Sequence, residues 1–425
     1  MQITYNFPFI PARPLSRPST EFSFDHISGR DVILMNFKMM GGGDMALAEK
    51  ITAIALNLGC RIVMVPIITD GKKTRMLAPF SVKMANSGAD IASLNNPVIV
   101  ITPVGYYPVE ALRKDIEDLC RSHNIVKQDA ILIDEMDLLN TDRLNLEQKT
   151  RCLKGMGFQN IIPYKLGFSE GAIGYIPIDL NTIDAIKDRC KYELGIFLDS
   201  LNLALDVQSD YYLGYICSKQ ASLASRKFIF NTLVEKINDC SQSNYIIVVT
   251  ELESFRTQLV ISMKETLGSN EENKEIDNNA ARLFSKTSIF LAGEDDHYLS
   301  KVTEISGVGN KLVNIIFCNK LPKNIFHDFI YLSRTGMASG DQSLSEFLSL
   351  TKKVPYYEVQ PWKFHLAESL SKIANDVGGS ELRTWFSHRI VGQDQYGDEF
   401  STELASIQKK PDTLSKYERK YREIS

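Results

Sequence analysis

A polar stretch in the second half of the chain combines residue types that could bind an anionic sugar ligand. Residues 339–346 read Ser-Gly-Asp-Gln-Ser-Leu-Ser-Glu, after the apolar run Phe329–Leu332 and at the start of a helical pattern with Leu344 and Phe347 on one face. A glycine loop between a strand and a helix forms an anion site, because the free N–H groups of the first helical turn and the helix dipole both favour negative charge. A carboxylate one turn further, Glu346, can accept hydrogen bonds from sugar hydroxyls.

These features predict a nucleotide-sugar pocket. The residues of this segment expected to bind the ligand are Gly340, Asp341, Gln342, Ser343 and Glu346. A structural alternative is a capping box, Ser-x-x-Glu, in which Glu346 returns to the backbone of Ser343. That alternative leaves Gly340 and Asp341 unexplained, and also the aromatic and polar run 356–362 after the next strand. The ligand interpretation is therefore preferred.

A second glycine loop follows the first predicted strand, where Gly41, Gly42 and Gly43 precede Asp44. Glycines let the backbone turn sharply and approach a ligand closely. The letters also match the dinucleotide fingerprint, but the acid expected near the end of the second strand is missing, since Asp70 comes late. A nicotinamide-dependent oxidoreductase therefore ranks last. Asp44 has two interpretations, the N-cap of the next helix or a general base.

Further polar residues end other predicted strands. Asp134, Glu135 and Asp137 lie at and beyond the end of the strand at 130–134, and acids at the carboxyl end of a parallel strand face the cleft. Asp134 is thus the second candidate base, with a capping or solvated role as the alternative. Lys219 follows the strand at 211–217, and Arg226 lies in the next helix. Their cations suit a diphosphate, although a plain polar loop would have the same composition.

Apolar strands alternate with amphipathic helices along the whole chain. The predicted strands lie at 32–36, 61–67, 98–102, 130–134, 160–163, 211–217, 245–250, 287–291, 313–318, 329–332 and 354–357. Continuous apolar strands between helices indicate parallel sheets covered on both faces. The predicted fold is α/β, with two doubly wound, Rossmann-like domains facing each other across a cleft that holds the ligand. Residues 1–200 are expected to form the acceptor domain, and residues 201–425 the donor domain with a C-terminal helical tail.

Composition narrows the classes of function. The 425 residues carry a net charge of −4, which argues against electrostatic binding of nucleic acid. The seven cysteines are widely spaced without a Cys-x-x-Cys pair, which argues against a disulfide framework or a structural zinc site. No apolar run approaches the ~20 residues that span a bilayer, and the first residues lack a secretory signal. The expectation is a soluble, cytoplasmic protein without a transmembrane segment.

With these segments placed, the chain resembles the two-domain GT-B glycosyltransferases. In the bacterial peptidoglycan N-acetylglucosaminyltransferase family, a glutamate lies six residues after the glycine of a Ser-Gly-Ala loop, and Gly340 and Glu346 hold that spacing. The resemblance implies that Glu346 binds the nucleotide ribose. It also implies that Gln360 and neighbouring Glu358 face the donor sugar.

The same resemblance extends to other segments. Phe317–Ser333 is similar to the family's base-binding strand, loop, helix and strand, which implies that the backbone near Phe317 and Asn319 meets the base. The Gly-Asp-Gln-Ser core is also similar to the Gly-Glu-Asp-Ser core of the protein-arginine rhamnosyltransferases that modify elongation factor P. In those enzymes an aspartate in the first glycine loop acts as the general base. Asp44 holds the corresponding place in this chain. The chain departs from the pattern where Thr335–Ala338 stand as an insertion and where Ser218-Lys219-Gln220 replaces a Gly-Gly pair.

The resulting hypothesis is a metal-independent, inverting glycosyltransferase that moves a sugar from a nucleotide-sugar donor to an unidentified acceptor, with a protein or glycan as candidates. No Asp-x-Asp metal motif is present, and no cofactor besides the donor substrate is expected. One alternative is an epimerase or hydrolase of the same fold that acts on a nucleotide sugar alone. Another is a non-catalytic interaction module, which the missing Gly-Gly pair favours.

Overall fold

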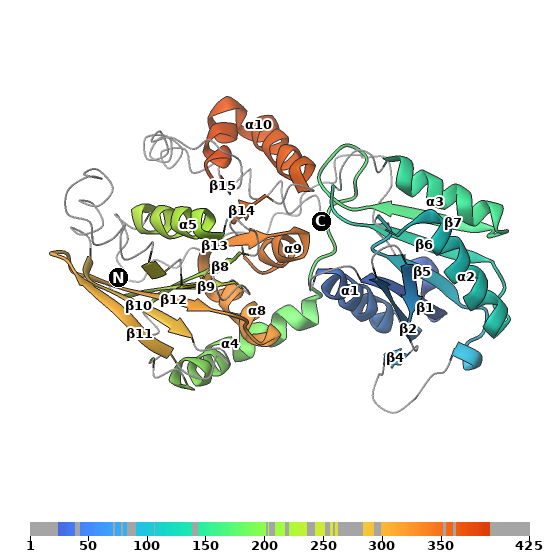
Figure 1. The fold of residues 1–425 in the computed structure, drawn as a ribbon, viewed down its shortest axis with the longest axis horizontal. Coiled ribbons are helices and arrows are strands. Elements are labelled where there is room, and N and C mark those ends of the chain that lie inside the picture. Colours follow the sequence, from blue (N-terminus) through green and yellow to red (C-terminus); the bar gives the residue numbers. More distant parts are fainter. Residues whose placement is uncertain are drawn as a thin grey trace, which may run out of the picture.

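The computed structural model shows two sheets, each with helices against it (Figure 1). It describes residues 24–38, 43–70, 73–77, 80–82, 91–105, 107–137, 143–200, 203, 209–216, 221–235, 243–250, 256–257, 260–261, 284–292, 299–351, 354–359 and 363–391. The predicted architecture, two Rossmann-like α/β domains, is confirmed.

The first sheet is parallel apart from two short strands. The parallel strands, in spatial order, are β2 (Arg61–Asp70), β1 (Asp31–Lys38), β5 (Val98–Thr102), β6 (Asp129–Asp134) and β7 (Asn160–Lys165). The strands β3 (Lys73–Met76) and β4 (Phe80–Val82) pair antiparallel with β2. Every residue of β5 is buried, as expected for a strand covered on both faces.

Three helices cover the two faces of this sheet. The helix α1 (Gly43–Asn57) packs on one face through Leu47 and Ile51. On the other face lie α2 (Val109–His123) and α3 (Arg143–Gly155), which contribute Ile116 and Leu153 to a separate apolar cluster. The sheet is thus doubly wound, and the side chains at the carboxyl ends of its strands lie at one edge.

The second sheet has eight strands in the order β11-β10-β12-β9-β8-β13-β14-β15. They are β8 (Asp210–Tyr215), β9 (Ser243–Val249), β10 (Phe284–Ala292), β11 (Leu299–Ser306), β12 (Lys311–Cys318), β13 (Ser333–Ser339), β14 (Tyr356–Glu358) and β15 (Ile390–Val391). All pair in parallel except β11, which runs antiparallel to β10. The helix α5 (Ala221–Glu235) packs on one face, and α8 (Lys323–Leu332) and α9 (Asp341–Leu350) on the other.

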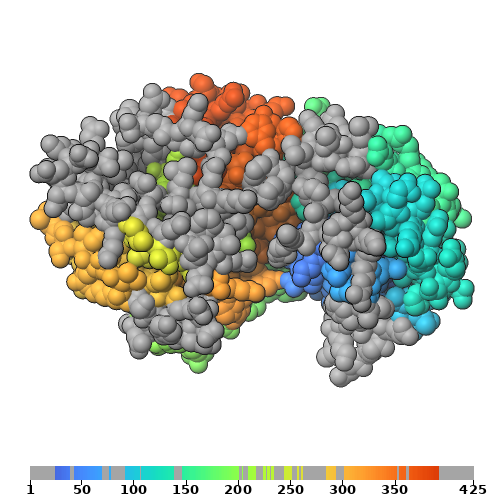
Figure 2. Space-filling model, viewed as in Figure 1, coloured from blue at the N-terminus to red at the C-terminus, as the bar shows by residue number. Residues whose placement is uncertain are grey.

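The two domains meet through helices. The helix α1 of the first domain packs against α9 of the second, and α4 (Leu180–Ser200) packs against α8. One apolar cluster, which includes Leu47 of α1 and Leu344 of α9, runs through both domains. In Figure 2 the first sheet and its helices, blue to teal, gather on one side of the molecule, and the second sheet, yellow to orange, lies on the other. The division at residues 200 and 201 stays a prediction.

The longest helices are α4, with 21 residues, and α10 (Phe364–Ser387), with 24. The backbone of α10 is kinked at Gly379, where φ is 68°, a conformation that glycine adopts without strain. None of the helices in the described ranges has the length and hydropathy to cross a membrane.

One predicted strand is wrong. The run Phe329–Leu332 is the last turn of α8, and the strand that follows is Ser333–Ser339. Ile325 and Phe329 are four residues apart and both buried, so the apolar run belongs to a helical face. The residues Thr335–Ala338, which stand as an insertion in the resemblance, are the body of β13. The antiparallel strands β3, β4 and β11 are missing from the prediction.

Candidate functional site

A strand, a glycine turn and a helix follow one another at the start of α9, with β13 in place of the strand predicted at 329–332. β13 ends at Ser339, Gly340 turns the chain with φ of 86°, and α9 begins at Asp341. No side-chain hydrogen bond caps this helix among the described residues. The first-turn N–H groups of a helix have no partners within it, so this end can accept an anion.

The capping-box alternative is wrong. Ser343 is the third residue of α9, not its cap, and its Oγ accepts a hydrogen bond from the Ser339 N–H (3.0 Å) and donates to the Ser339 carbonyl (2.7 Å). Glu346 does not return to Ser343; its Oε1 lies 3.3 Å from Nε2 of His327 on α8. The serine hydroxyl fixes the loop before the helix, and the glutamate belongs to a different contact.

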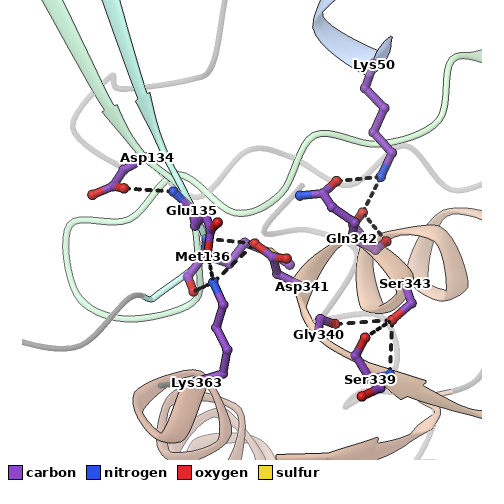
Figure 3. A network of polar contacts seen from close by, with 11 residues as sticks. Lys50, Asp134, Glu135, Met136, Ser339, Gly340, Asp341, Gln342, Ser343 and Lys363 are labelled. Carbon is purple, nitrogen blue, oxygen red and sulfur yellow. Dashed lines mark hydrogen bonds and ion pairs between the residues drawn. The ribbon is translucent and has the colours of Figure 1, made fainter. Parts of the chain in front are cut away.

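Lys363, at the start of α10, connects the second domain to the first (Figure 3). Its Nζ lies 2.5 Å from Oε2 of Glu135, which directly follows β6, and 3.3 Å from Oδ2 of Asp341. Lys363 Nζ also donates to the carbonyl of Met136 (3.3 Å). The N–H of Met136 in turn donates to Oδ2 of Asp341 (3.4 Å). A buried lysine thus holds one carboxylate from each domain.

The charges of this cluster are strongly coupled. Burial would lower the pKa of Lys363, but the carboxylates of Asp341 and Glu135 outweigh it and raise that pKa above its ordinary value. The pKa of Glu135 is raised to about 7, because burial and the negative charges of Asp341 and Asp44 together outweigh the opposing charge of Lys363. Lys363 therefore stays charged, while Glu135 changes its charge near neutral pH.

A second lysine reaches α9 from the first domain. Lys50 of α1 donates to Oε1 of Gln342 (3.2 Å) and to Oγ of Ser345. Its side chain is buried, and both acceptors are neutral. Burial lowers the pKa of Lys50, and the carboxylates of Glu346 and Asp341 oppose that effect. The two lysines therefore contact the first turns of α9 from opposite domains, as Figure 3 shows.

Glu346 is held as an anion. Burial would raise its pKa, but the hydrogen bond with His327 and the positive charge of Lys50 outweigh burial, so the pKa of Glu346 lies below its ordinary value. Glu346, the residue predicted to bind the ribose, thus offers its carboxylate oxygens one turn into α9. His327 fixes one of them, because it projects from α8 on the same face of the sheet.

Glu358, predicted to face the donor sugar, lies in β14 beside Ser339 of β13 in the strand register. Oγ of Ser339 donates to Oε2 of Glu358 at 2.5 Å, and Glu358 is fully buried. This hydrogen bond ties the end of β13 to its neighbour directly before the glycine turn.

The acids after β6 divide into two roles. The Oδ1 atom of Asp134 accepts the N–H of Glu135 (3.0 Å). The carboxylate of Asp137 accepts the N–H groups of Phe168 (2.6 Å) and Ser169 (3.1 Å). Both side chains are buried and hold the loop itself. Of these acids, Glu135 is the one whose carboxylate contacts the second domain.

Asp44 is the second residue of α1 and lies in its first turn. The Nδ2 of Asn36, at the end of β1, donates to the Asp44 carbonyl (3.0 Å) and to the Thr102 carbonyl (3.2 Å). The side chain of Asp44 is half-buried, and its charge acts on Glu135. Asp44 is therefore close to the cluster around Lys363, as a base candidate must be.

The other predicted site residues lie in different surroundings. Gly43 starts α1 near Gln342, since a Cβ added there would lie 3.7 Å from the Cγ of Gln342. The ring of Phe317 is part of the apolar core of the second sheet, and Asn319 is half-buried directly beyond β12. Predicted site residues that lie outside the described residues are Gly41, Gly42, Lys219, Gln360 and the side chain of Arg226.

Sequence reasoning missed three side chains of this site: Lys50, Lys363 and His327. A signal existed for Lys50, which falls on the apolar side of α1, three residues after Leu47 and four before Ile54. Lys363 lies three residues after Gln360, which is predicted to face the donor sugar, but nothing in the letters distinguishes it from a surface lysine. The side chains described here form no group of three or more His, Cys, Asp or Glu that could hold a metal ion.

Comparison with known proteins gives likenesses of fold only. No protein-family model matches the sequence, and neither does any curated protein. Among solved structures the chain is similar to EarP, described as mediating arginine glycosylation of elongation factor EF-P, with 9% identity, 92% of each chain covered and a TM-score of 0.41.

Two further solved structures are similar over most of their length. A UDP-forming α,α-trehalose-phosphate synthase from Burkholderia xenovorans has 10% identity, with 93% of this chain and 96% of that chain covered and a TM-score of 0.40. An α-glucosyltransferase in complex with UDP-glucose and abasic DNA has 10% identity, with 93% and 95% covered and a TM-score of 0.35. These likenesses assign the chain to no family.

Proposed function

We propose that this protein is a metal-independent glycosyltransferase that transfers a sugar from a nucleotide-sugar donor to an acceptor. The observation that carries the proposal is the uncapped start of α9, at the carboxyl end of β13, with a lysine approaching from each domain. Amide N–H groups at a helix start and buried ammonium groups are donors suited to a diphosphate. Glu346 lies one turn further into α9, and its ionised carboxylate can accept hydrogen bonds from the ribose hydroxyls.

The proposed chemistry needs no metal. The developing charge on the departing nucleoside diphosphate is stabilised by the helix N-terminus and by Lys50 and Lys363. A carboxylate of the first domain, with Asp44 and Asp134 as the sequence candidates, removes the acceptor proton. In-line attack at the anomeric carbon, through an oxocarbenium-like state, inverts its configuration. The acceptor, a protein or a glycan, approaches from the first domain.

Donor entry must involve movement between the domains. Asp341, Gln342, Ser343 and Glu346 are all buried, and Lys50 and Met136 of the first domain contact two of them. A ligand can reach the start of α9 only when these contacts part. Opening and closure of domains around a substrate is a common step in such enzymes, and closure excludes water from the reaction.

The first test is a thermal-shift panel of UDP-, GDP-, dTDP- and CMP-sugars. A ligand present at 100 times its Kd stabilises the folded state by about 2.7 kcal/mol. The donor should therefore raise the Tm by a few degrees. The absence of a shift with every nucleotide sugar would contradict the proposal and favour a non-catalytic interaction module.

The second test measures whether Glu346 is needed for donor binding in a protein that is still folded. Glu346→Ala should abolish the donor signal in titration calorimetry without unfolding the protein. The matched control is Glu147→Ala, which removes an exposed glutamate on α3 that pairs with Arg151. The control should bind as the wild type does. Undiminished donor binding by Glu346→Ala would overturn the assignment of the donor site.

A second candidate is an epimerase or hydrolase that acts on the nucleotide sugar alone. The observation in its favour is the enclosed acid–base cluster of Glu135, Asp341 and Lys363. Turnover of the donor to an epimerised sugar, without any acceptor, would support this candidate over transfer.

A further inference from the structure

Of the three acids at the end of β6 and in the loop after it, Glu135 is the one whose carboxylate pairs with the second domain. Asp134 accepts the N–H of Glu135, and Asp137 accepts the N–H groups of Phe168 and Ser169. Asp137 also takes a left-handed backbone conformation with φ of 40°. These contacts fix the loop between two anchors. Glu135 lies between the anchors and extends toward the second domain.

The surroundings of Glu135 are set by three charged groups from three elements. Lys363 at the start of α10 lies 2.5 Å away, and it also contacts Asp341 at the start of α9. Asp44 in the first turn of α1 adds a second negative charge. Glu135 therefore faces the uncapped helix end to which the proposed function assigns the donor diphosphate.

We propose that Glu135, oriented by Lys363, is the group of the first domain that removes the proton of the acceptor. The inference rests on the proposed function. In the reaction, the Glu135 carboxylate takes the proton of the acceptor O–H or N–H as that atom forms a bond to the anomeric carbon. The bond from the anomeric carbon to the diphosphate oxygen breaks, and its electron pair leaves with the nucleoside diphosphate. Glu135 then releases the proton to water.

Glu135 suits this role better than Asp134 or Asp44. Asp134 is engaged with the backbone of its own loop. Asp44 is half-buried at the start of α1, and it acts on Glu135 through its charge. The pKa of Glu135, raised to about 7, matches a general base at neutral pH, because such a base works best with a pKa near the operating pH. Lys363, besides its proposed contact with the diphosphate, holds the Glu135 carboxylate and lowers its pKa, and so for the proton transfer it is a positioning residue.

The test uses the full chain and the nucleotide sugar that gives the largest thermal shift with wild-type protein. Release of nucleoside diphosphate is followed with water as the acceptor, since water also needs a base. Glu135→Gln should keep the thermal shift and lose turnover by about 10²–10⁴-fold. The matched control is Glu49→Gln, another first-domain glutamate paired with a second-domain lysine, Lys323, but at the surface. Its turnover should equal that of the wild type.

A pH profile tests the role of Lys363. Wild-type turnover should rise with pH through about 7 as Glu135 loses its proton. Lys363→Met should move this rise to higher pH, because the cation that lowers the pKa of Glu135 is gone, whereas Lys363→Arg should leave it in place. A purely structural role of Lys363 would not move the profile. Glu135→Asp, which keeps a carboxylate, provides the same test if the glutamine variant does not fold.

The experiments distinguish a failure of this inference from a failure of the proposed function. Binding of the donor with equal turnover and an equal pH profile in Glu135→Gln would overturn the inference and leave the proposed function intact. No thermal shift with any nucleotide sugar in the wild type would overturn the proposed function, and the inference with it. A loss of turnover in Glu49→Gln as large as in Glu135→Gln would show a general effect of domain contact and would also overturn the inference.

Discussion

The Nζ of Lys363 and the Oε2 of Glu135 lie 2.5 Å apart, although 228 positions separate the two residues in the chain. The pair joins the start of α10 to the loop after β6 and is nearly excluded from solvent. A second pair, Lys323 with Glu49, also crosses between the domains, but both of its side chains are about half exposed. The two pairs therefore differ mainly in burial, which decides how much each contributes to stability.

The first prediction compares these pairs. Removing one partner of a buried ion pair leaves a charge without compensation and costs about 3–5 kcal/mol, whereas an exposed pair contributes about 0–1 kcal/mol. Lys363→Met should therefore destabilise the protein by several kcal/mol at pH 8, and Lys323→Met by less than about 1 kcal/mol. At pH 6 the loss in Lys363→Met should shrink, because Glu135 takes up a proton. Urea denaturation measures both variants, and equal losses would contradict the prediction.

The second prediction concerns the pH dependence of stability. The pKa of Glu135 is about 7 in the folded protein and 4.5 ordinarily, so between these values the folded state binds more protons than the unfolded state. Stability then falls as pH rises through this window. The shift corresponds to at most about 3 kcal/mol.

Unfolding midpoints in urea between pH 5 and pH 8 provide the measurement. The wild type should lose stability over this range, and Glu135→Gln should remove that part of the slope. Glu49→Gln, which alters an exposed carboxylate, should keep the wild-type slope. A slope unchanged in Glu135→Gln would mean that other groups cause it.

Most of the fold could be predicted from the sequence, because parallel strands buried on both faces leave continuous apolar runs. The runs at Val98–Thr102 and Arg61–Ile67 are examples. The run Phe329–Leu332 was misassigned as a strand, since a short apolar run at a helix end has the same letters. β11 carries Lys301 and Glu304 along an exposed edge, so it lacked the apolar signal of a buried strand.

The site could be predicted only in part. The glycine turn at Gly340 and the start of α9 at Asp341 could be predicted, because they depend on the few residues next to them in the sequence. The roles of Lys50 and Lys363 depend on which surfaces the two domains bring together. Such contacts join residues 228 and 292 positions apart, and no local pattern encodes them.

The third prediction tests how β13 supports α9. A Cβ on Gly336 would lie 2.2 Å from Cε1 of Phe347 and 2.5 Å from the Leu213 carbonyl. Gly336→Ala should therefore displace Phe347 and with it α9, at a cost of about 1–3 kcal/mol. Donor affinity should fall as well, since the start of α9 moves.

Gly155→Ala is the control for this change. Gly155 ends α3, and a Cβ there meets nothing within 4 Å. Alanine at that position should leave stability and donor affinity within error of the wild type or slightly raise the Tm. Tm and calorimetry give both quantities. A Gly336→Ala variant as stable as Gly155→Ala would show that the sheet and α9 are not packed this tightly.

The fourth prediction separates binding from stability at Lys50. Among the described residues, the hydrogen-bond partners of this buried ammonium are the neutral Gln342 and Ser345, and its burial lowers its pKa. Lys50 has no hydrogen-bonded carboxylate among the described residues, so Lys50→Met should destabilise the protein by less than Lys363→Met does. Donor affinity should fall at least tenfold, because a cation at the diphosphate is lost; tenfold in affinity corresponds to about 1.4 kcal/mol. Lys187→Met, at the exposed surface of α4, is the control and should bind normally. Strong destabilisation by Lys50→Met with unchanged donor affinity would mean that Lys50 serves only to join α1 to α9.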